Sequence, residues 1–403
     1  MSPTPPAPRA VPLRVGFAID ILHPGAGTEN QLVLLLQSFD REWVLPFVAC
    51  LRNGANVAEA DIGCPLDVLD IAKIAPPDGI RGITAMRRWI RGRRLDLLVT
   101  FFRDANIFGT LGGRWAGVPV VSSRRNLGRG YWHTPRELFM LRLLNRMTRA
   151  YVANSEAVRA YTIETERVSP ESITVIPNAI DLARFRPSAV PILPEQRWRL
   201  GLPEGFLIGC VANLRPIKGI DVLVRAVGTS EVLRDQVHLV LVGSGPLEGT
   251  LRALSAELGI AERVHFFGMR SDVPDILRVL DMAVLCSHAE SSPNAVLEYM
   301  ATGLPVIATN VGGVPELFSS ESVGRMVPSG NPGELARAIE LFFESPELRS
   351  EMGRRARQHT EAQHSIPAVA EKWMQFFDRV HALSHTVFRP SDEPPVVIKK
   401  SAS

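Results

Sequence analysis

The chain has 403 residues, which is long for a single hydrophobic core and favours two domains or one elaborated α/β domain. Its composition, 46% hydrophobic and 22% charged, is that of a soluble globular enzyme, and no apolar run of about 18 residues predicts a transmembrane helix. The net charge is only +3, but residues 86–150 hold 14 arginines against three acidic residues and predict a local basic surface.

The first twelve residues, MSPTPPAPRAVP, are rich in proline and lack the apolar core of a secretory signal. They predict a disordered leader over residues 1–12 and no export. The cysteines show no spacing typical of metal ligands, and two of them lie inside apolar runs. We therefore expect reduced core residues in a cytosolic protein at Cys50, Cys64, Cys210 and Cys286.

Strand-like apolar runs alternate with helix-like segments from Leu13 onwards, which predicts a parallel sheet covered on both faces. The strand candidates of the first half are LRVGFAID, WVLPFVAC, DVLDI, DLLVT, PVVSS and AYVANS. The clearest helix is TPRELFMLRLLNRMTR, residues 134–149, in which Thr134, Pro135 and Glu137 form a capping box. A first α/β domain is therefore expected over residues 13–190.

The same alternation restarts after a proline-rich segment that lacks sustained periodicity, so a domain boundary is expected near residues 187–200. The second strand series is FLIGCVA, VHLVLVG, VHFFG, DMAVLCS and PVIATN, and it predicts a second α/β domain over residues 200–365. An amphipathic helix follows over 366–385, and a disordered tail over 386–403. Two such sheets imply a cleft between the carboxyl ends of their strands.

The segment HAESSPNAVLEYMATGLPVIA, residues 288–308, predicts an anion site. Ser292 is expected to cap its helix, Pro293 fits the first helical position, and Gly303 ends the helix. The N–H groups of Asn294 and Ala295 would then point outwards without partners, as at helix starts that bind phosphate.

Two glutamates flank that helix start. Glu298 lies among apolar residues of the helix, and a buried carboxylate needs donors, which a ribose diol would supply. Glu290 precedes the helix and would face the reacting end of the same ligand. The alternative is that Glu298 pairs with a core arginine while Glu290 is merely exposed.

Three loops that follow strands add to this interpretation. In VANLRPIKGID, Arg215 and Lys218 suit a diphosphate, although a solvated helix start is the alternative. Gly243 in LVGSGPLEGTL indicates a tight turn rather than a dinucleotide fingerprint. Gly25 and Gly27 in HPGAGTEN permit close approach of the backbone to a ligand, or form a plain glycine turn.

Taken in order, these segments resemble glycosyltransferase family 4, whose members are retaining enzymes of the GT-B fold. The resemblance covers roughly residues 13–345 and runs through GAGTE, VANS, VIPNAIDLARF, VANLRPIKG, LVGSGPL, HFFG and GLPVIATNVGGVPE. The pair Glu290 and Glu298 matches the E-x7-E hallmark of the family. This implies an α/β fold of two Rossmann-like domains with parallel sheets facing across a cleft, and a C-terminal helix that crosses back to the first domain.

The resemblance also implies a role for each matching position. Glu298 would hold the ribose of a nucleotide sugar, Glu290 would contact the transferred sugar, and Arg215 with Lys218 would stabilise the leaving diphosphate. Cations and a helix terminus would take the role of a divalent metal, so neither a metal nor a cofactor is expected. The other donor contacts would come from Ser291, Ser292, Asn294, Ala295, Gly243, Met269 and Arg270.

This sequence departs from the family pattern at two places. The usual arginine falls where this chain has Asn213, which makes Arg215 a displaced substitute. Many members have a histidine after the strand that here reads PVVSS, but this chain continues SRRNLGRGYWH. The candidates for that work are Arg124, Arg125, Asn126 and His133, and the candidates for the rest of the acceptor side of the cleft are Gly25, Gly27 and Thr28.

The leading hypothesis is a retaining enzyme that moves a sugar from a UDP- or GDP-sugar to a glycan or lipid-linked acceptor. It would act in bacterial cell-surface polysaccharide or glycolipid biosynthesis, in the cytoplasm at the inner face of the cell membrane. The arginine-rich segment favours contact with anionic lipid, or forms a solvated basic face; no nucleic-acid module is present. The alternatives are a silent partner subunit that binds nucleotide sugar, suggested by the missing histidine, and a GT-B nucleotide-sugar epimerase.

Overall fold

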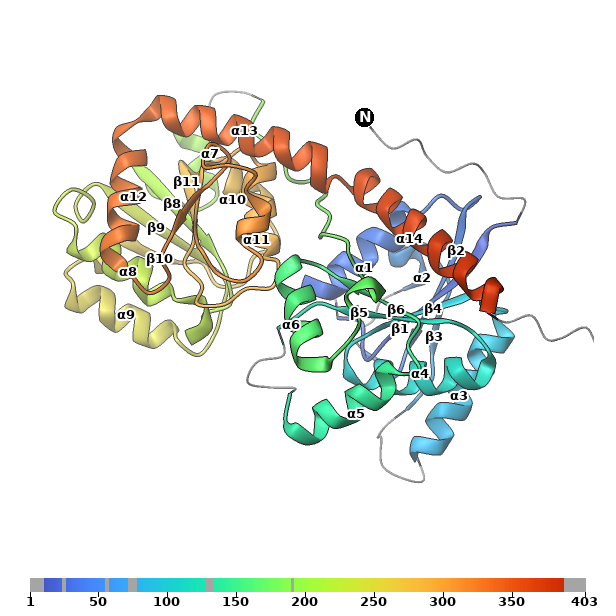
Figure 1. Ribbon diagram of the computed structural model, residues 1–403. Coiled ribbons are helices and arrows are strands. Elements are labelled where there is room, and N and C mark those ends of the chain that lie inside the picture. The colour runs from blue at the N-terminus through green and yellow to red at the C-terminus, as the bar shows by residue number, and fades with distance from the viewer. Residues whose placement is uncertain are drawn as a thin grey trace, which may run out of the picture.

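The chain forms two α/β domains that lie side by side, each built on one parallel sheet (Figure 1). The computed structural model describes residues 11–23, 27–54, 58–71, 78–127, 133–189 and 192–387. The two-sheet α/β architecture expected from the sequence is confirmed. The expected leader and tail lie almost wholly outside the described residues.

The first sheet has seven strands in the order β3-β2-β1-β4-β5-β6-β7, and every neighbouring pair is parallel. The order reverses direction between β1 and β4, which is where ligands bind in open sheets of this kind. All six expected strands are present, and β7 was not expected. The strands are β1 (Leu13–Ile19), β2 (Val44–Cys50), β3 (Leu66–Val68), β4 (Leu97–Phe101), β5 (Val120–Arg124), β6 (Ala150–Ala153) and β7 (Ile173–Val175).

Helices cover both faces of this sheet because its strands are apolar on both sides. Leucines of α1 and aromatic residues of α14 pack on one face, and α3 and α4 pack on the other. The helices of this domain are α1 (Gly27–Ser38), α2 (Glu59–Ile62), α3 (Asp78–Gly92), α4 (Arg103–Ala116), α5 (Pro135–Asn145) and α6 (Glu156–Glu166), with a 3-10 turn η1 (Pro170–Ser172).

The start of α5 confirms the expected capping box. The Thr134 hydroxyl accepts from the Glu137 N–H at 3.3 Å, and the Glu137 carboxylate accepts from the Thr134 N–H at 3.2 Å. The expected end at residue 149 is wrong, because the chain turns after Asn145 to enter β6.

The second sheet has six parallel strands in the order β10-β9-β8-β11-β12-β13, and it reverses between β8 and β11. Helices α8, α9 and α12 pack on one face, and α10, α11 and α13 pack on the other. Only β13, three residues long, was not expected. The strands are β8 (Phe206–Val211), β9 (Val237–Val242), β10 (Val264–Phe266), β11 (Met282–Leu285), β12 (Val306–Thr309) and β13 (Arg325–Val327).

The helices of the second domain alternate with its strands. They are α8 (Ile220–Thr229), α9 (Glu248–Glu257), α10 (Val273–Arg278), α11 (Asn294–Ala301) and α12 (Pro332–Glu344), with 3-10 turns η2 (Pro216–Lys218), η3 (Ala261–Arg263) and η4 (Pro315–Leu317). The segment between the two sheets is not wholly irregular, since it contains a short helix, α7 (Pro194–Arg199).

The C-terminal helices tie the domains together, as expected. Helix α13 (Pro346–His364) belongs to the second domain, and α14 (Ile366–Val387) crosses to the first (Figure 1). There Trp373, Phe376 and Phe377 are buried against the core of the first sheet. Between the two helices, Ser365 forms a bridge with Ile180 of the inter-sheet segment.

Two further observations bear on the sequence analysis. All four cysteines are unpaired and buried, which confirms them as reduced core residues. In the described part of the chain, no helix combines the length and the apolar character needed to cross a bilayer.

Candidate functional site

A cleft of about 410 Å³ lies between the carboxyl ends of the two sheets. The first domain contributes the start of α1 and the loops after β5, β6 and β7, and the second contributes the loops after β8, β9 and β11. Among the expected site residues, the cleft is lined by Gly27, Thr28, Arg125, Lys218, Gly243, Met269, Arg270, Glu290, Ser291, Ser292, Asn294, Ala295 and Glu298.

Asn178, in the VIPN segment after β7, joins the two domains at this cleft. Its side-chain amide donates to the Asn294 carbonyl at 2.8 Å and to the Ser292 backbone carbonyl at 3.1 Å. Its own side-chain carbonyl accepts from Arg125 at 2.7 Å. Gln31 adds a second contact between the domains, since its side-chain amide donates to the Asn294 side-chain carbonyl at 3.3 Å. Two hydrogen bonds of 2.8 Å hold Gln31 to the backbone of Ala179 within the first domain.

The start of α11 differs from the expectation by one residue. The helix begins at Asn294 with Pro293 as its N-cap, so Ser292 as cap and Pro293 as first helical residue are both wrong. Ser292 does not cap the helix, and its backbone carbonyl accepts a hydrogen bond from the Asn178 side chain. No side chain caps the helix, so its first N–H groups remain open to an anion in the cleft. Gly303 follows the helix with a φ of 79°, as expected for its end.

Glu298 is half-buried in α11 and reaches the cleft. Its neighbours Val296, Leu297 and Met300 are buried and apolar, and the hydroxyl of buried Tyr299 is hydrogen-bonded to the backbone of Val211. No described residue donates a hydrogen bond to the Glu298 carboxylate, and Arg184 acts on it only through its charge. Burial raises the pKa of Glu298 to about 7. The alternative in which Glu298 pairs with a core arginine is therefore wrong.

Glu290 is largely buried rather than exposed. Its carboxylate accepts from the Lys218 ammonium at 2.5 Å and from the Ser287 hydroxyl at 2.7 Å. Gly219, at a φ of 58°, permits this approach, because a Cβ there would lie 2.3 Å from the Cys286 carbonyl oxygen. Lys218 keeps two N–H donors that no described residue accepts, so it can hold an anion while paired.

Arg215 is in the expected strand-to-helix turn, but it does not line the cleft. Its side chain is exposed, whereas Asn213, two residues earlier, reaches the cleft lining. The structure therefore brings Lys218 and Glu290 together and leaves Arg215 outside them. Gly243 forms the expected tight turn, with a φ of 133° and its backbone against that of Ala212.

Met269 and Arg270 form the outer end of the cleft in the second domain. Met269 is 81% exposed, which leaves its apolar side chain free to contact a ligand. Arg270 is paired with Asp272, the two side chains being joined by hydrogen bonds of 2.7 and 2.5 Å. These two side chains are more than 20 residues from Glu298 in sequence and lie at the same cleft.

A second cavity of about 280 Å³ opens in the first domain, beside the reversal between β1 and β4. Asp20 at the end of β1 lines it and accepts the N–H of Ala105, at the start of α4, at 2.7 Å. Burial raises the pKa of Asp20 to about 6. Helix α5 forms another wall through Glu137, Met140 and Leu141.

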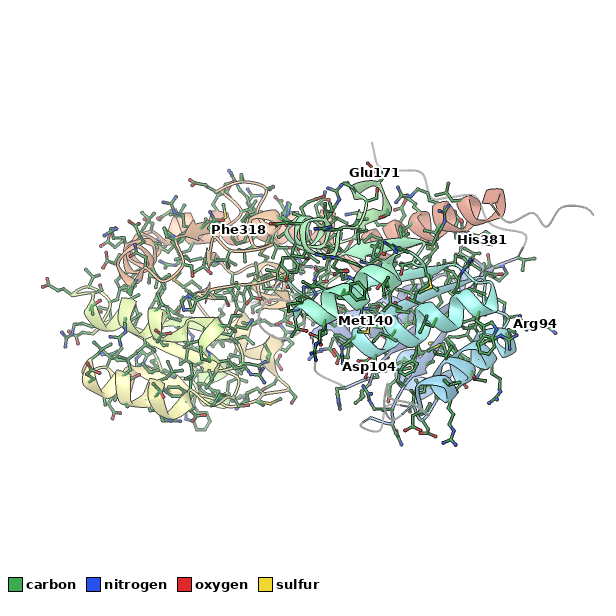
Figure 2. All side chains as sticks on the ribbon, turned by 60° about the horizontal axis from the view of Figure 1, so that its bottom comes forward. Arg94, Asp104, Met140, Glu171, Phe318 and His381 are labelled. Atoms are coloured by element: carbon green, nitrogen blue, oxygen red, sulfur yellow. The ribbon has the colours of Figure 1, made fainter. Side chains whose placement is uncertain are left out.

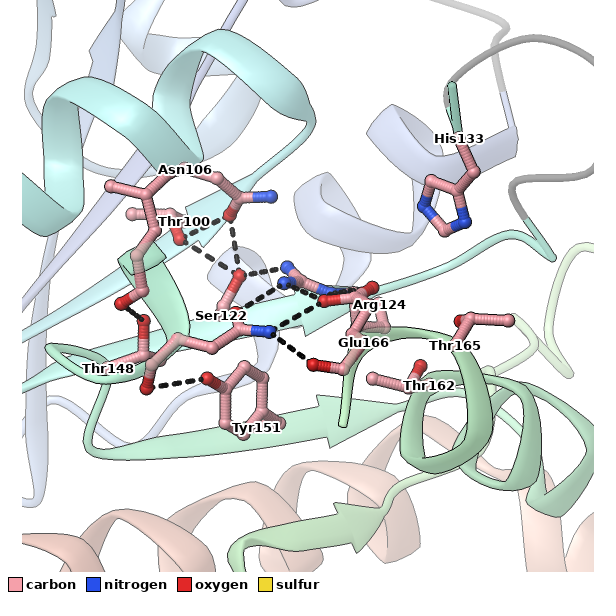
Figure 3. Close-up of polar contacts among 12 residues, drawn as sticks. Thr100, Asn106, Ser122, Arg124, His133, Thr148, Tyr151, Thr162, Thr165 and Glu166 are labelled. Atoms are coloured by element: carbon pink, nitrogen blue, oxygen red, sulfur yellow. Dashed lines mark hydrogen bonds and ion pairs between the residues drawn. The ribbon is translucent and has the colours of Figure 1, made fainter. Parts of the chain in front are cut away.

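The four candidates for the work of the missing histidine all line this cavity, but they have different surroundings. Arg124 is committed to the fold, because it forms a buried ion pair of 2.8 Å with Glu166 within a polar network (Figure 3). Burial alone would raise the pKa of Glu166, yet Arg124 holds it below its ordinary value. His133 lies apart from that network in Figure 3 and is hydrogen-bonded to Tyr161 at 2.8 Å.

Arg125 is the only one of these four that lines the cleft as well as the cavity. Asn126 is exposed at the rim of the cavity. Burial lowers the pKa of His133, so this side chain is neutral at pH 7 and reaches only the cavity. The structure thus singles out Arg125 among the candidates.

Other site residues were missed or cannot be placed. Gly25 lies outside the described residues. Gln31, Asn154, Asn178 and Asn213 line the cleft but were not among the expected site residues. The motifs VANS and VIPN contained the signal for Asn154 and Asn178, because a polar residue directly after a buried strand faces the carboxyl edge of the sheet.

This arrangement suits a ligand that carries both hydroxyl groups and phosphates. An unpartnered carboxylate lies in the middle of α11, and open N–H groups and an ammonium lie at the start of this helix. The first domain supplies a separate cavity, and Arg125 lines both the cavity and the cleft.

Comparison with known proteins gives the family of the chain. Residues 26–184 match the family model described as Glycosyltransferase Family 4, and residues 194–359 match the model described as Glycosyl transferases group 1. Together these models cover both domains. The chain belongs to glycosyltransferase family 4, a family of transferases.

The curated relatives include D-inositol 3-phosphate glycosyltransferases. The protein of that name from Streptomyces scabiei is 29% identical over 79% of this chain and 76% of its own length. The one from Salinispora arenicola is 30% identical, but the match spans only 52% of this chain and half of that relative. A crystal structure of Anabaena Alr3699/HepE in complex with UDP has the same fold, with a TM-score of 0.80, 21% identity, and coverage of 91% of this chain and 100% of that one.

The raised pKa of Glu298 predicts a pH-dependent effect on stability. In the unfolded chain this carboxyl ionises near pH 4.5, and in the folded protein near pH 7, so its contribution to stability falls as pH rises between these values. Glu298→Gln removes the effect and should stabilise the protein relative to wild type at pH 8 by about 1–3 kcal/mol more than at pH 5. Calorimetric unfolding at both pH values measures this, and an equal difference at the two would contradict it.

Proposed function

We propose that this protein is a retaining glycosyltransferase that takes its sugar from a nucleotide diphosphate sugar. The observation that carries the proposal is the cleft-facing carboxylate of Glu298, which has no donor in the described chain, on the same short helix as an uncapped N-terminus. A ribose diol would satisfy the carboxylate, and phosphates would satisfy the terminus. The Anabaena protein of the same fold is named as binding UDP and UDP-glucose.

The chemistry proposed for the cleft is electrostatic. As the bond between sugar and phosphate breaks, negative charge grows on the diphosphate, beside the free N–H donors of Lys218 and the start of α11. Glu290 holds the Lys218 ammonium in place and is the candidate contact for the transferred sugar. Retention of configuration follows from attack on the same face as the departing phosphate.

The acceptor is proposed to be a glycan or a lipid-linked molecule, bound in the cavity of the first domain. We place the reaction in the cytoplasm, in bacterial cell-surface polysaccharide or glycolipid biosynthesis. The curated relatives are named for inositol 3-phosphate, and this chain matches several of them over only about half of their length.

A silent nucleotide-sugar-binding subunit is the alternative that the missing histidine supports. Arg125 weakens that support, since it places a cationic donor between cavity and cleft. An epimerase has no specific observation in its favour. Nucleotide-sugar binding without turnover in the presence of acceptor extract would favour the silent subunit.

Lys218→Ala is expected to lower the rate of nucleotide release from the donor sugar by about 100-fold or more, because it removes a donor aimed at the leaving group. The matched control is Arg215→Ala, three residues away, exposed and outside the cleft lining, for which a much smaller loss is expected. Steady-state release of UDP and GDP from a panel of sugar nucleotides measures both. Equal losses in the two variants would contradict the assignment of Lys218.

We propose that no divalent metal is needed, since an ammonium and a helix terminus already face the phosphates. Treatment of the protein with EDTA, followed by the same assay with and without added Mg²⁺ or Mn²⁺, is expected to leave the rate unchanged within about twofold. A loss with EDTA that Mg²⁺ or Mn²⁺ restores would show that a metal takes part.

We also propose that the first domain contacts an anionic membrane through α5 and the arginines around it. Figure 2 turns this side of the domain towards the reader, with Met140 of α5 and Asp104 of α4 labelled. Helix α5 has only one fully buried residue, and two of its large apolar side chains are exposed, Phe139 at 65% and Leu143 at 42%. The exposed arginines on α3, α4, α5 and the turns that follow them are Arg81, Arg88, Arg91, Arg94, Arg114, Arg136, Arg146 and Arg149.

Exchange of both Phe139 and Leu143 for serine should weaken binding to vesicles of phosphatidylglycerol by roughly tenfold, because two apolar side chains then no longer enter the interface. The control is Trp198→Ser, which removes a 77% exposed side chain from the second domain and should have no effect. Co-sedimentation with anionic and with neutral vesicles measures both. Undiminished binding of the double variant, or equal binding to neutral vesicles, would contradict the proposal.

A further inference from the structure

Five cationic side chains line the cleft and the neighbouring cavity in the described part of the chain. Four of them are paired with a carboxylate. The pairs and their shortest distances are Arg103 with Glu137 at 3.4 Å, Arg124 with Glu166 at 2.8 Å, Lys218 with Glu290 at 2.5 Å and Arg270 with Asp272 at 2.5 Å. Of these five, only Arg125 has no carboxylate partner among the described residues.

The partners of Arg125 are neutral. Its Nε donates to the Ser123 hydroxyl at 3.1 Å, and its Nη1 donates to the side chain of Asn178 at 2.7 Å. The ring of Phe101 lies 5.7 Å from the guanidinium. A guanidinium has five N–H donors, and those on Nη2 of Arg125 reach no described residue. Burial lowers the pKa of Arg125 to about 10, so the side chain is still charged at neutral pH.

A cation that is partly buried without a counter-ion is costly, and the cost falls when an anion binds. Two neutral partners also fix the guanidinium plane, which leaves its remaining donors in the fork geometry that suits a phosphate or a carboxylate. Arg125 is therefore built to receive an anion from outside the chain.

A second unmet group lines the same cleft. The side-chain oxygen of Asn154 is buried and accepts no hydrogen bond within the described structure. A buried acceptor of this kind is satisfied by a donor, such as the hydroxyl group of a bound molecule. The first domain thus presents one donor set for an anion and one acceptor for a hydroxyl.

We propose that the acceptor substrate bears an anionic group, a phosphate or a carboxylate, that Arg125 binds where the cavity meets the cleft, and a hydroxyl group that Asn154 accepts. The assignment to the acceptor rests on the proposed function. It is favoured by position, because Arg125 follows β5 and lines a cavity formed only by the first domain, whereas Lys218 and the start of α11 belong to the second.

The test uses the full-length protein saturated with UDP or GDP, titrated calorimetrically with inorganic phosphate, with glucose 6-phosphate and with glucose. We expect both phosphates to bind and glucose to bind roughly tenfold more weakly. Arg125→Gln should lose about tenfold in affinity for both phosphates, and Arg125→Lys should lose less. The control is Arg103→Gln, which lines the same cavity but lies between carboxylates, and it should bind phosphate as wild type does.

Three outcomes would overturn the proposal. One is unchanged phosphate affinity in Arg125→Gln, and another is an equal loss in Arg103→Gln. The third is a loss of UDP or GDP affinity in Arg125→Gln together with exclusion of phosphate by bound nucleotide, which would assign the anion to the donor diphosphate. Phosphate is also titrated into nucleotide-free protein. Because this measurement needs neither nucleotide nor turnover, it tests anion binding at Arg125 separately from the proposed function. Arg125→Lys replaces Arg125→Gln if the Gln variant does not fold.

Discussion

The hydrogen bonds of Asn178 determine how the two halves of this protein face each other. One amide side chain accepts from Arg125 of the first domain and donates to Asn294 and to the Ser292 carbonyl of the second. Gln31 reinforces the same junction through its hydrogen bond to Asn294. Because these contacts lie at the carboxyl ends of both sheets, they bring the start of α11, the cavity and the cleft into one site.

The site at this junction combines charged groups that are paired within the protein with charged groups that are not. The pairs Lys218–Glu290 and Arg124–Glu166 are complete ion pairs, and the second belongs to the fold. In contrast, no described residue donates a hydrogen bond to the Glu298 carboxylate, and no described carboxylate pairs with the Arg125 guanidinium. Unmatched charge that is partly buried lowers stability, and its presence on opposite sides of one cleft is the basis for the two ligands that we propose, one with hydroxyl groups towards Glu298 and one with an anion towards Arg125.

Much of this could be predicted from sequence because it depends on local patterns. Apolar runs between helical segments predicted both sheets, and the helix around Glu298 predicted a buried carboxylate near a phosphate site. The strands β7 and β13 were missed although β3 and β10, which are equally short, were predicted. Strand β7 leads directly into the proline-containing segment that begins with VIPN and is expected from the sequence to be a linker. The role of Asn178 depends on Asn294, 116 residues away, and Arg124 differs from its neighbour Arg125 only because Glu166 lies beside it in space. The expected cap at Ser292 did not form, and the Ser292 carbonyl accepts a hydrogen bond from Asn178, which is also remote in sequence.

We propose that Glu298 binds the ribose of a nucleotide in the cleft. This proposal is tested most directly by calorimetric titration of the wild-type protein with the nucleoside diphosphate that it binds and with the analogue that lacks both ribose hydroxyls. A carboxylate that accepts from two hydroxyls predicts that the analogue binds at least roughly tenfold more weakly, and that Glu298→Ala abolishes this difference. Equal affinity of the wild-type protein for the two compounds would contradict the account.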